Sequence, residues 1–244
     1  MVNPVDTLRA LHHDRAPEDP LILPGPWDAA SARVFEEAGY EALATPSAGI
    51  ALSLGYEDGQ VPPEEMFAAI GRIVRSVSVP VTADVEGGYG LAPKELVDRL
   101  LETGAVGCNL EDSFAAEDGT HALRDPAEQA AFLAAVREAA GDRLFINARV
   151  DTFVRGVPEP VAAAVERGRL YVAAGADCVY PILAPAESIP ALREGIEGPL
   201  NAVAVPGGPS LRELGALGAT RITFGPGLLH RAMSSLRDIA EQLR

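Results

Sequence analysis

The chain has 244 residues, of which 48% are hydrophobic, and its formal net charge is −15. The length is close to the roughly 250 residues of a barrel of eight strand–helix units, and the composition is that of a globular protein. So acidic a chain repels nucleic acids and anionic membranes, which we exclude as partners, and it has to recruit anionic ligands locally through a metal, an arginine or helix N-termini.

In chain order, the polar start Met1–Pro20 has no apolar signal core, and no later apolar run approaches the roughly 20 residues of a membrane span, so we expect a cytoplasmic protein. From Leu21 onward, short apolar runs alternate with longer amphipathic stretches, a pattern that indicates a parallel sheet. The expected strands are Leu21–Leu23, Ala42–Thr45, Val79–Ala83, Val106–Leu110, Leu144–Ala148, Cys178–Pro181, Leu200–Val205 and Arg221–Phe224. The expected helices are Trp27–Ala38, Pro63–Val77, Pro93–Thr103, Pro126–Ala140, Pro160–Ala174, Ala186–Glu194, Ser210–Leu217 and Leu228–Leu243.

Every second expected strand is preceded by a glycine that follows a helix, at Gly39, Gly104, Gly175 and Gly218. Glycine suits the left-handed backbone that often ends a helix. This two-unit alternation favours a closed barrel over an open doubly wound sheet, which stays the alternative. Because there is no linker, we predict one domain of class α/β over residues 1–244, a (β/α)8 TIM barrel. Its two cysteines fall within strands, where we expect reduced, buried thiols.

Acidic residues gather where barrel active sites lie, at the C-terminal ends of the strands. Asp84 and Glu86 follow the third strand two residues apart, so both side chains leave the same face. Glu111 ends the fourth strand, and Asp58 follows the second. Converging carboxylates repel one another, and oxygen ligands favour a hard cation, Mg²⁺ or Mn²⁺. Solvated loop carboxylates are the alternative, which we favour for Glu57 or Asp112 taken alone.

Other residues near these ends suit a small anionic ligand. Three glycines flank Tyr89 and let the backbone turn sharply beside the acidic pair. Arg149 ends the fifth strand, where it either forms a structural ion pair or binds a substrate carboxylate with two N–H groups. Ser47, Ala48 and Gly49 form an expected loop after the second strand whose free N–H groups could hold a carboxylate.

Five segments, in order between about residue 20 and about residue 230, resemble the isocitrate lyase/phosphoenolpyruvate mutase (phosphonomutase) superfamily. The most specific is Asp84-Val85-Glu86-Gly87-Gly88-Tyr89-Gly90, which is similar to the family's Asp-x-Asp-x-Gly-Tyr-Gly run. The others are Pro26-Trp27-Asp28-Ala29-Ala30-Ser31-Ala32, Ser47-Ala48-Gly49 with Leu54-Gly55 and Asp58, Leu110-Glu111-Asp112, and Ala148-Arg149-Val150-Asp151.

The resemblance implies a role for each matching residue. Asp84 corresponds to the direct Mg²⁺ ligand, and Glu86, Glu111 and Asp58 to the carboxylates that hold the metal's waters. Substrate binding is implied for residues 47–49, for Asp84 and for Arg149, and we add Trp27 and Asn201 to this set. Family members cleave or form C–C or P–C bonds beside a pyruvate-like enolate. They are usually tetramers that exchange a C-terminal helix, so we expect a homo-oligomer, a dimer or a tetramer.

The loop Ser113–Arg124 departs from the family pattern, because it lacks the Lys-Cys-Gly-His of the lyases and the Lys and Asn-Ser of the mutases. The proton donor is therefore left open between water, Tyr89 and His121. We expect this loop to be a lid with Gly119 as its hinge, and Glu117 and Asp118 are its other ionisable candidates.

These features predict a metal-dependent lyase or decarboxylase that cleaves a C–C bond adjacent to a 2-oxo acid, with Arg149, Tyr89 and His121 as candidate catalytic residues. One alternative is P–C bond chemistry of the phosphonopyruvate hydrolase or mutase type. Another is a barrel that binds a phosphorylated ligand through the turns Val205–Ser210 and Gly225–Gly227, where barrels often bind phosphate.

Overall fold

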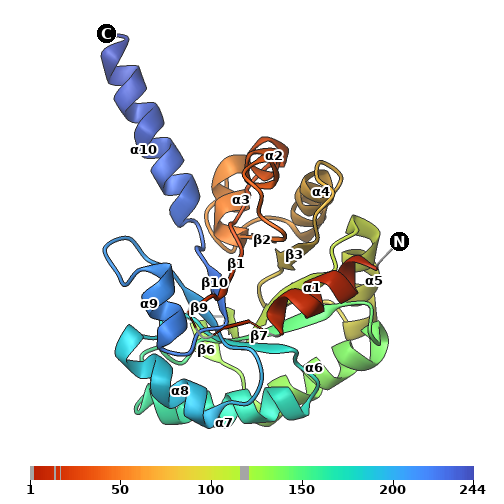
Figure 1. The fold of residues 1–244 in the computed structure, drawn as a ribbon. Helices are drawn as coiled ribbons and strands as arrows, with labels where there is room; N and C mark the ends of the chain where they lie inside the picture. Colours follow the sequence, from red (N-terminus) through yellow and green to blue (C-terminus); the bar gives the residue numbers. More distant parts are fainter. Residues whose placement is uncertain (1–2, 14, 17, 116–120) are drawn as a thin grey trace.

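Eight parallel strands form a ring in the computed structural model, which describes residues 3–13, 15–16, 18–115 and 121–244 (Figure 1). Each overlaps a strand expected from the sequence. They are β1 Leu21–Ile22, β2 Leu43–Thr45, β3 Val81–Asp84, β4 Gly107–Glu111, β7 Phe145–Val150, β8 Cys178–Pro181, β9 Asn201–Val203 and β10 Arg221–Thr223. The remaining two strands, β5 Ser113–Ala115 and β6 His121–Leu123, form an antiparallel pair beyond β4 that the sequence analysis did not predict.

Hydrogen bonds close the ring at both gaps between its two sheets. One sheet runs β1-β10-β9 and the other β2-β3-β4-β7-β8. Val179 N–H donates to Pro199 at 3.1 Å beside a parallel bridge to Leu200, which joins β8 to β9. Ala44 N–H donates to the carbonyl of Pro24 at 3.1 Å, which joins β2 to the chain just after β1. The barrel prediction is confirmed, and the open doubly wound sheet is wrong.

Helices alternate with the strands and surround them (Figure 1). The four predicted helix-ending glycines adopt the left-handed backbone, with φ of 91° at Gly39, 84° at Gly104, 99° at Gly175 and 116° at Gly218. The helices that match expected segments are α2 Ala29–Glu37, α4 Pro63–Val74, α5 Pro93–Thr103, α6 Pro126–Ala140, α7 Pro160–Ala173, α8 Ile189–Gly195 after the 3₁₀ turn Ala186–Ser188, α9 Leu211–Ala216 and α10 Gly227–Gln242. Two further helices in the described chain were not predicted from the sequence, α1 Pro4–His12 and α3 Ser47–Leu54.

Helix α1 packs against the N-terminal ends of the strands. Leu8 is fully buried in a cluster with Leu21 and Phe145, and the ring of His12 stacks on that of Phe145 with centroids 4.1 Å apart. Arg9 donates to the carbonyls of Asp142 at 2.7 Å and Leu144 at 3.0 Å. Helix α1 therefore covers this end of the barrel at β1 and β7, and the strand ends that carry the predicted site residues lie at the opposite end.

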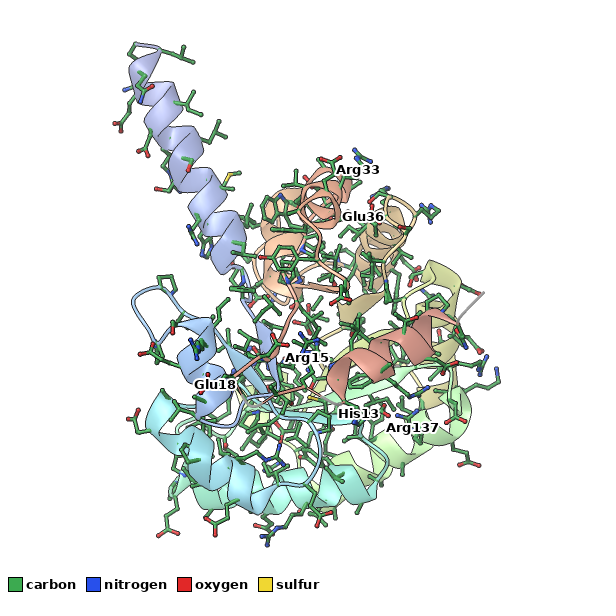
Figure 2. All side chains as sticks on the ribbon, viewed as in Figure 1. His13, Arg15, Glu18, Arg33, Glu36 and Arg137 are labelled. Atoms are coloured by element: carbon green, nitrogen blue, oxygen red, sulfur yellow. The ribbon has the colours of Figure 1, made fainter. Side chains whose placement is uncertain are left out.

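Helix α10 points away from the barrel, and its side chains extend without a neighbouring element along most of its length (Figures 1 and 2). Leu229, near its start, is its one residue described as buried. Leu236, Ile239 and the following Leu243 are 54%, 52% and 82% exposed. No helix in the described part of the chain is both long and apolar enough to cross a membrane.

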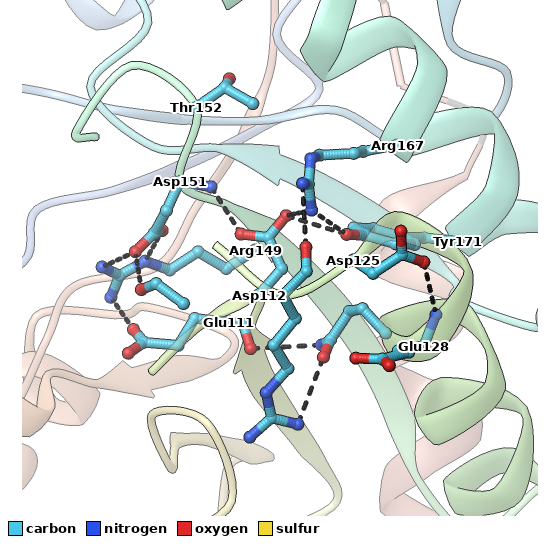
Figure 3. Close-up of polar contacts among 12 residues, drawn as sticks. Glu111, Asp112, Asp125, Glu128, Arg149, Asp151, Thr152, Arg167 and Tyr171 are labelled. Atoms are coloured by element: carbon cyan, nitrogen blue, oxygen red, sulfur yellow. Dashed lines mark hydrogen bonds and ion pairs between the residues drawn. The ribbon is translucent and has the colours of Figure 1, made fainter. Parts of the chain in front are cut away.

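A buried ion pair fixes the ends of β4 and β7 against α7 (Figure 3). The fully buried Asp112 carboxylate accepts hydrogen bonds from Arg167 Nη1 at 2.9 Å, the Tyr171 hydroxyl at 2.8 Å and the Asp151 N–H at 2.9 Å. Asp112 thus supports the strand ends from behind. It is not the solvated loop carboxylate that the sequence favoured.

We predict that Asp112→Ala lowers the free energy of unfolding by about 3–5 kcal/mol, because it leaves Arg167 buried without its partner. Urea denaturation measures this change. Asp98→Ala is the control, since it removes a carboxylate whose ion pair with Lys94 at 2.6 Å is solvent-exposed and worth less than about 1 kcal/mol. Equal losses in the two variants would contradict the supporting role of Asp112.

Candidate active site

A cavity of about 170 Å³ opens at the C-terminal ends of the barrel strands. Parallel pairing brings its residues together: Asp84 of β3 lies opposite Asn109 of β4, and Glu111 of β4 lies opposite Arg149 of β7. The lining residues are Ala44, Thr45, Pro46, Ser47, Ala48, Asp58, Asp84, Asn109, Arg149, Tyr180, Ile182, Thr223, Gly225 and Pro226. This is where ligands bind in barrels of this type.

Two of the predicted carboxylates, Asp58 and Asp84, line the cavity, and Glu86 and Glu111 lie beside it, near enough to Asp84 for their charges to interact. Burial raises the pKa of Asp84, although Arg149 opposes this and Ser47 donates to its carboxylate at 3.0 Å. Burial, followed by repulsion from Asp84 and Asp58, raises the pKa of Glu86 to about 7. Burial raises the pKa of Glu111 to about 8, against the attraction of Arg149 and with repulsion from Asp151 and Asp84. Ionisation of one of these carboxylates makes ionisation of its neighbours less favourable.

The loop after β3 is held in an unusual backbone conformation. Glu86 and Tyr89 have φ values of 52° and 56°, in the left-handed region that residues with a Cβ rarely adopt. A hydrogen bond of 3.0 Å from the Glu111 N–H to the Glu86 carbonyl fixes the first of them. Such strain is typical of residues held for function, and here it accompanies a glutamate directed toward the other carboxylates.

The donor set fits a divalent cation. The Oε1 atom of Glu86 is buried and has no hydrogen-bond partner among the residues that the structure describes. Within that same part of the chain, no three His, Cys, Asp or Glu side chains lie close enough together to bind one ion directly. The described residues that could hold such a cation, directly or through its waters, are Asp84, Glu86, Glu111 and Asp58.

Arg149 is both an ion-pair partner and a lining residue of the cavity (Figure 3). Its Nη1 lies 2.7 Å from Glu111, and its Nε and Nη2 donate to the two oxygens of Asp151 at 2.7 and 3.0 Å. Asp151 is fully buried and also accepts a hydrogen bond from Ser113 at 2.5 Å. A guanidinium has five N–H groups and Asp151 accepts hydrogen bonds from two of them, so Arg149 is held in orientation and still keeps N–H groups for a ligand. The two alternatives raised by the sequence are thus compatible.

The segment Ser47–Gly49 is not the loop that the sequence predicted. It is the first turn of α3, which Pro46 precedes in extended conformation. The first N–H groups of a helix have no partner within it, but the Ser47 N–H, like its hydroxyl, interacts with the Asp84 carboxylate and opposes the rise of its pKa. Pro46, Ser47 and Ala48 line the cavity, and N–H groups free to bind a ligand carboxylate stay a prediction.

Several predicted residues lie beside the cavity instead of lining it. Trp27 packs against Gly49, whose added Cβ would lie 3.6 Å from that of the tryptophan. Asn201 is buried and accepts a hydrogen bond from Thr223, and it is Thr223 that lines the cavity. The hydroxyl of Tyr89 is buried without a partner among the described residues, and burial together with the nearby Glu86 raises its pKa.

The loop candidates have mixed outcomes. His121 is exposed on β6 and does not line the cavity. Glu117, Asp118 and the proposed hinge Gly119 lie outside the described residues, so the lid stays a prediction. Cys108 and Cys178 are buried and unpaired, as predicted, and burial raises the pKa of each thiol to about 12.

The lining residues that were not predicted include four with polar or large side chains: Asn109, Tyr180, Ile182 and Thr223. Tyr180 is buried, and burial raises its pKa to about 12. All four lie in or just beyond the C-terminal half of a strand, so applying the strand-end rule to every strand would have found them. The prediction relied on charged residues, most of which lie at the ends of the third to fifth strands.

A barrel with converging carboxylates and one fixed arginine at its mouth defines a class of enzymes that act on small anionic substrates. The family model of phosphoenolpyruvate phosphomutase matches residues 8–244, and the chain belongs to this family. An uncharacterized protein of Mycobacterium tuberculosis is 32% identical over 88% of this chain and 80% of its own length. The chloroplastic carboxyvinyl-carboxyphosphonate phosphorylmutase of Arabidopsis thaliana is 34% identical, over 74% of this chain and 56% of its own.

Solved structures agree with this assignment. The 2,3-dimethylmalate lyase, described as a member of the PEP mutase/isocitrate lyase superfamily, has a TM-score of 0.86 and 27% identity, covering 100% of this chain and 88% of that one. A phosphonomutase-like protein of Burkholderia cenocepacia J2315 has a TM-score of 0.89 and 40% identity, covering 98% and 99%. The chain spans a little over half the length of the named curated mutase and lyases that it matches, between 53% and 62%.

We predict that Arg149→Lys lowers kcat/KM by an order of magnitude or more. Lysine keeps the charge, but it cannot bind Asp151 with two N–H groups and still present others to a ligand. Steady-state kinetics measures the loss, and Arg212→Lys, at an exposed ion pair with Glu18, is the control. Unchanged kinetics in Arg149→Lys would reduce Arg149 to a structural ion pair.

Proposed function

We propose that this protein is a carbon–carbon lyase that depends on Mg²⁺ or Mn²⁺ and cleaves the bond adjacent to a 2-oxo acid, through a pyruvate-like enolate. One observation carries the proposal: Arg149, fixed by Glu111 and Asp151, shares a cavity with Asp84 at the mouth of the barrel. Membership of a family whose named relatives include 2-methylisocitrate lyases supports the same reaction class.

The residues of the chain divide the work. The N–H groups of Arg149 that Asp151 does not use, and the first turn of α3, bind the carboxylate of the substrate and set its orientation. Asp84 would bind the metal, with Glu86, Glu111 and Asp58 holding its waters, and the bound metal supplies positive charge that stabilises the enolate oxygen. Asp151 and Ser47 keep Arg149 and Asp84 in position through their hydrogen bonds.

P–C bond chemistry is the second candidate, because the matching family model is that of a phosphomutase. Its substrates carry a phosphonate besides a carboxylate, and both would need cations. Assaying oxaloacetate and phosphonopyruvate side by side separates the two candidates. For the third, a phosphate-binding barrel, Gly225 and Pro226 line the cavity, whereas Val205–Gly207 and Pro209–Ser210 border a separate groove. Phosphate bound there, with no metal near Asp84, would favour it.

We predict that Asp84→Asn loses metal-dependent turnover by about 100-fold or more, because the proposed direct ligand loses its charge. The wild type is first screened with Mg²⁺ on 2-oxo and 2-hydroxy acids for release of pyruvate or glyoxylate, and the variant is assayed on the acid that is cleaved. Glu57→Gln, an exposed neighbour of Asp58 outside the cavity lining, is the control. Wild-type turnover by Asp84→Asn would show that the metal assignment is wrong.

We propose, further, that the protein is a homo-oligomer, a dimer or a tetramer, in which α10 packs against a second copy. The exposed apolar residues Leu236, Ile239 and Leu243 support this, because a helix of this length is marginal in water without a partner.

We predict that Leu236→Glu combined with Ile239→Glu shifts the molecular mass in solution to that of the monomer. Light scattering after size-exclusion chromatography measures the mass. Arg237→Glu changes the charge of the same helix and serves as the control. If the double variant keeps the wild-type mass, α10 does not form the interface.

A further inference from the structure

Apart from the metal of the proposed function, the cavity at the mouth of the barrel offers little positive charge. Arg149 is the one cation among its lining residues in the described structure, and Asp58 and Asp84 also line it. The Nε and Nη2 of Arg149 already donate to Asp151, and its Nη1 forms an ion pair with Glu111. The N–H groups that it has left suffice for one carboxylate.

The other cations near this end of the described barrel do not line the cavity; among them is Arg155, in the segment after β7, whose buried Nε has no hydrogen-bond partner among the described residues. Lys94, the only lysine of the sequence, is exposed on α5 and paired with Asp98. Arg221 is fully buried in β10, where its Nη2 donates to Asn109 at 3.3 Å, so Asn109 separates it from the cavity. Arg124 lies over the ring of Phe132, 5.4 Å from its centroid. Residues 116–120 read Ala-Glu-Asp-Gly-Thr and contain no basic side chain.

The wall opposite the carboxylates is uncharged and leads into an apolar groove. Tyr180, Ile182, Gly225 and Pro226 line both the cavity and a neighbouring groove of about 520 Å³. Leu183, Val203, Val205 and Phe224 line the groove further out. Its two basic residues, His230 and Arg231, are exposed on α10, where water competes for any ligand.

A second carboxylate at this wall would lie among uncharged side chains, with only the exposed His230 and Arg231 as basic residues of the groove, beside a cavity that Asp58 and Asp84 already make negative. Burial of an unpaired charge is strongly unfavourable, whereas a small aliphatic group gains by burial there. Accepting the proposed function, we propose that the substrate is a 2-oxo acid with a single carboxylate and an uncharged aliphatic tail that lies along Tyr180 and Ile182.

A substrate with a single carboxylate restricts which carbon–carbon bond can be cleaved. Decarboxylation, or cleavage that releases a succinate-like acid, needs a second carboxylate, so the leaving fragment has to be an uncharged carbonyl compound. In a 4-hydroxy-2-oxo acid, the C3–C4 bond breaks and its electron pair passes to C3, giving the enolate of pyruvate. The 4-hydroxyl proton is lost to water and C4 becomes an aldehyde, while C3 takes up one proton from water. The products, pyruvate and the aldehyde, balance the substrate without a co-reactant.

Two acids that differ only at the distal group provide the test. 4-Hydroxy-2-oxopentanoate ends in a methyl group and 4-hydroxy-2-oxoglutarate in a carboxylate, and cleavage of either releases pyruvate. With Mg²⁺ present, we expect kcat/KM for the first to exceed that for the second, and for oxaloacetate, by about 100-fold or more. Calorimetry provides a readout independent of turnover, in which 2-oxobutanoate should bind more tightly than 2-oxoglutarate.

A charge introduced at the uncharged wall should reverse the preference. Ile182→Arg is expected to raise the ratio of the dicarboxylate to the monocarboxylate kcat/KM by about 10-fold or more. Val34→Arg, which places the same charge on an exposed position of α2, should leave the ratio unchanged.

The outcomes separate this inference from the proposed function. Preference of the wild type for 4-hydroxy-2-oxoglutarate or oxaloacetate overturns the single-carboxylate substrate and leaves the metal-dependent lyase standing. An unchanged ratio in Ile182→Arg overturns the placement of the tail. If no acid of either kind is cleaved or bound, the lyase proposal fails and the inference with it.

Discussion

Repulsion among carboxylates is the interaction that the other residues at the mouth of the barrel have to compensate. Asp84, Glu86 and Glu111 converge in a partly buried site, and burial together with their mutual repulsion raises the pKa of Glu86 and Glu111 to about 7 and about 8. Arg149 relieves part of this repulsion, and Asp151 fixes its guanidinium in turn. The charge that is left uncompensated suits a divalent cation, and the N–H groups that Arg149 retains suit one carboxylate.

Most of the fold could be predicted from the sequence, because barrel units repeat a local pattern. In the described part of the chain, all eight barrel strands and eight of the ten α-helices overlap predicted segments. Apolar runs, prolines at helix starts and glycines at helix ends depend on the local backbone conformation, so they can be recognised in the sequence. The two missed helices have different causes. Helix α1 lies in a polar stretch whose buried residues are few, and α3 begins with small residues that are equally typical of a loop.

The site could be predicted less completely, because charge is visible in a sequence and its surroundings are not. Asp84, Asp58 and Arg149 line the cavity as predicted. Asn201 was assigned to the substrate, but its place in the layer below Thr223 depends on the packing of β9 against β10, which no local pattern reports. The alternation of side chains along a strand would have separated two neighbouring acidic residues. Asn109 and Glu111 lie on the same face of β4, and Asp112 has to lie on the other face.

Because of this alternation, the neighbouring residues Glu111 and Asp112 at the end of β4 contact different parts of the structure. Glu111 meets Arg149 at the cavity, whereas its neighbour Asp112 meets Arg167 and Tyr171 in the helix layer. A single-residue insertion or deletion in β4 would exchange the two, placing the structural carboxylate in the cavity and the ligand-side glutamate against α7. The length of β4 up to Asp112 is therefore constrained by two contacts at once, whereas the length of the segment after Ser113 is not subject to this constraint.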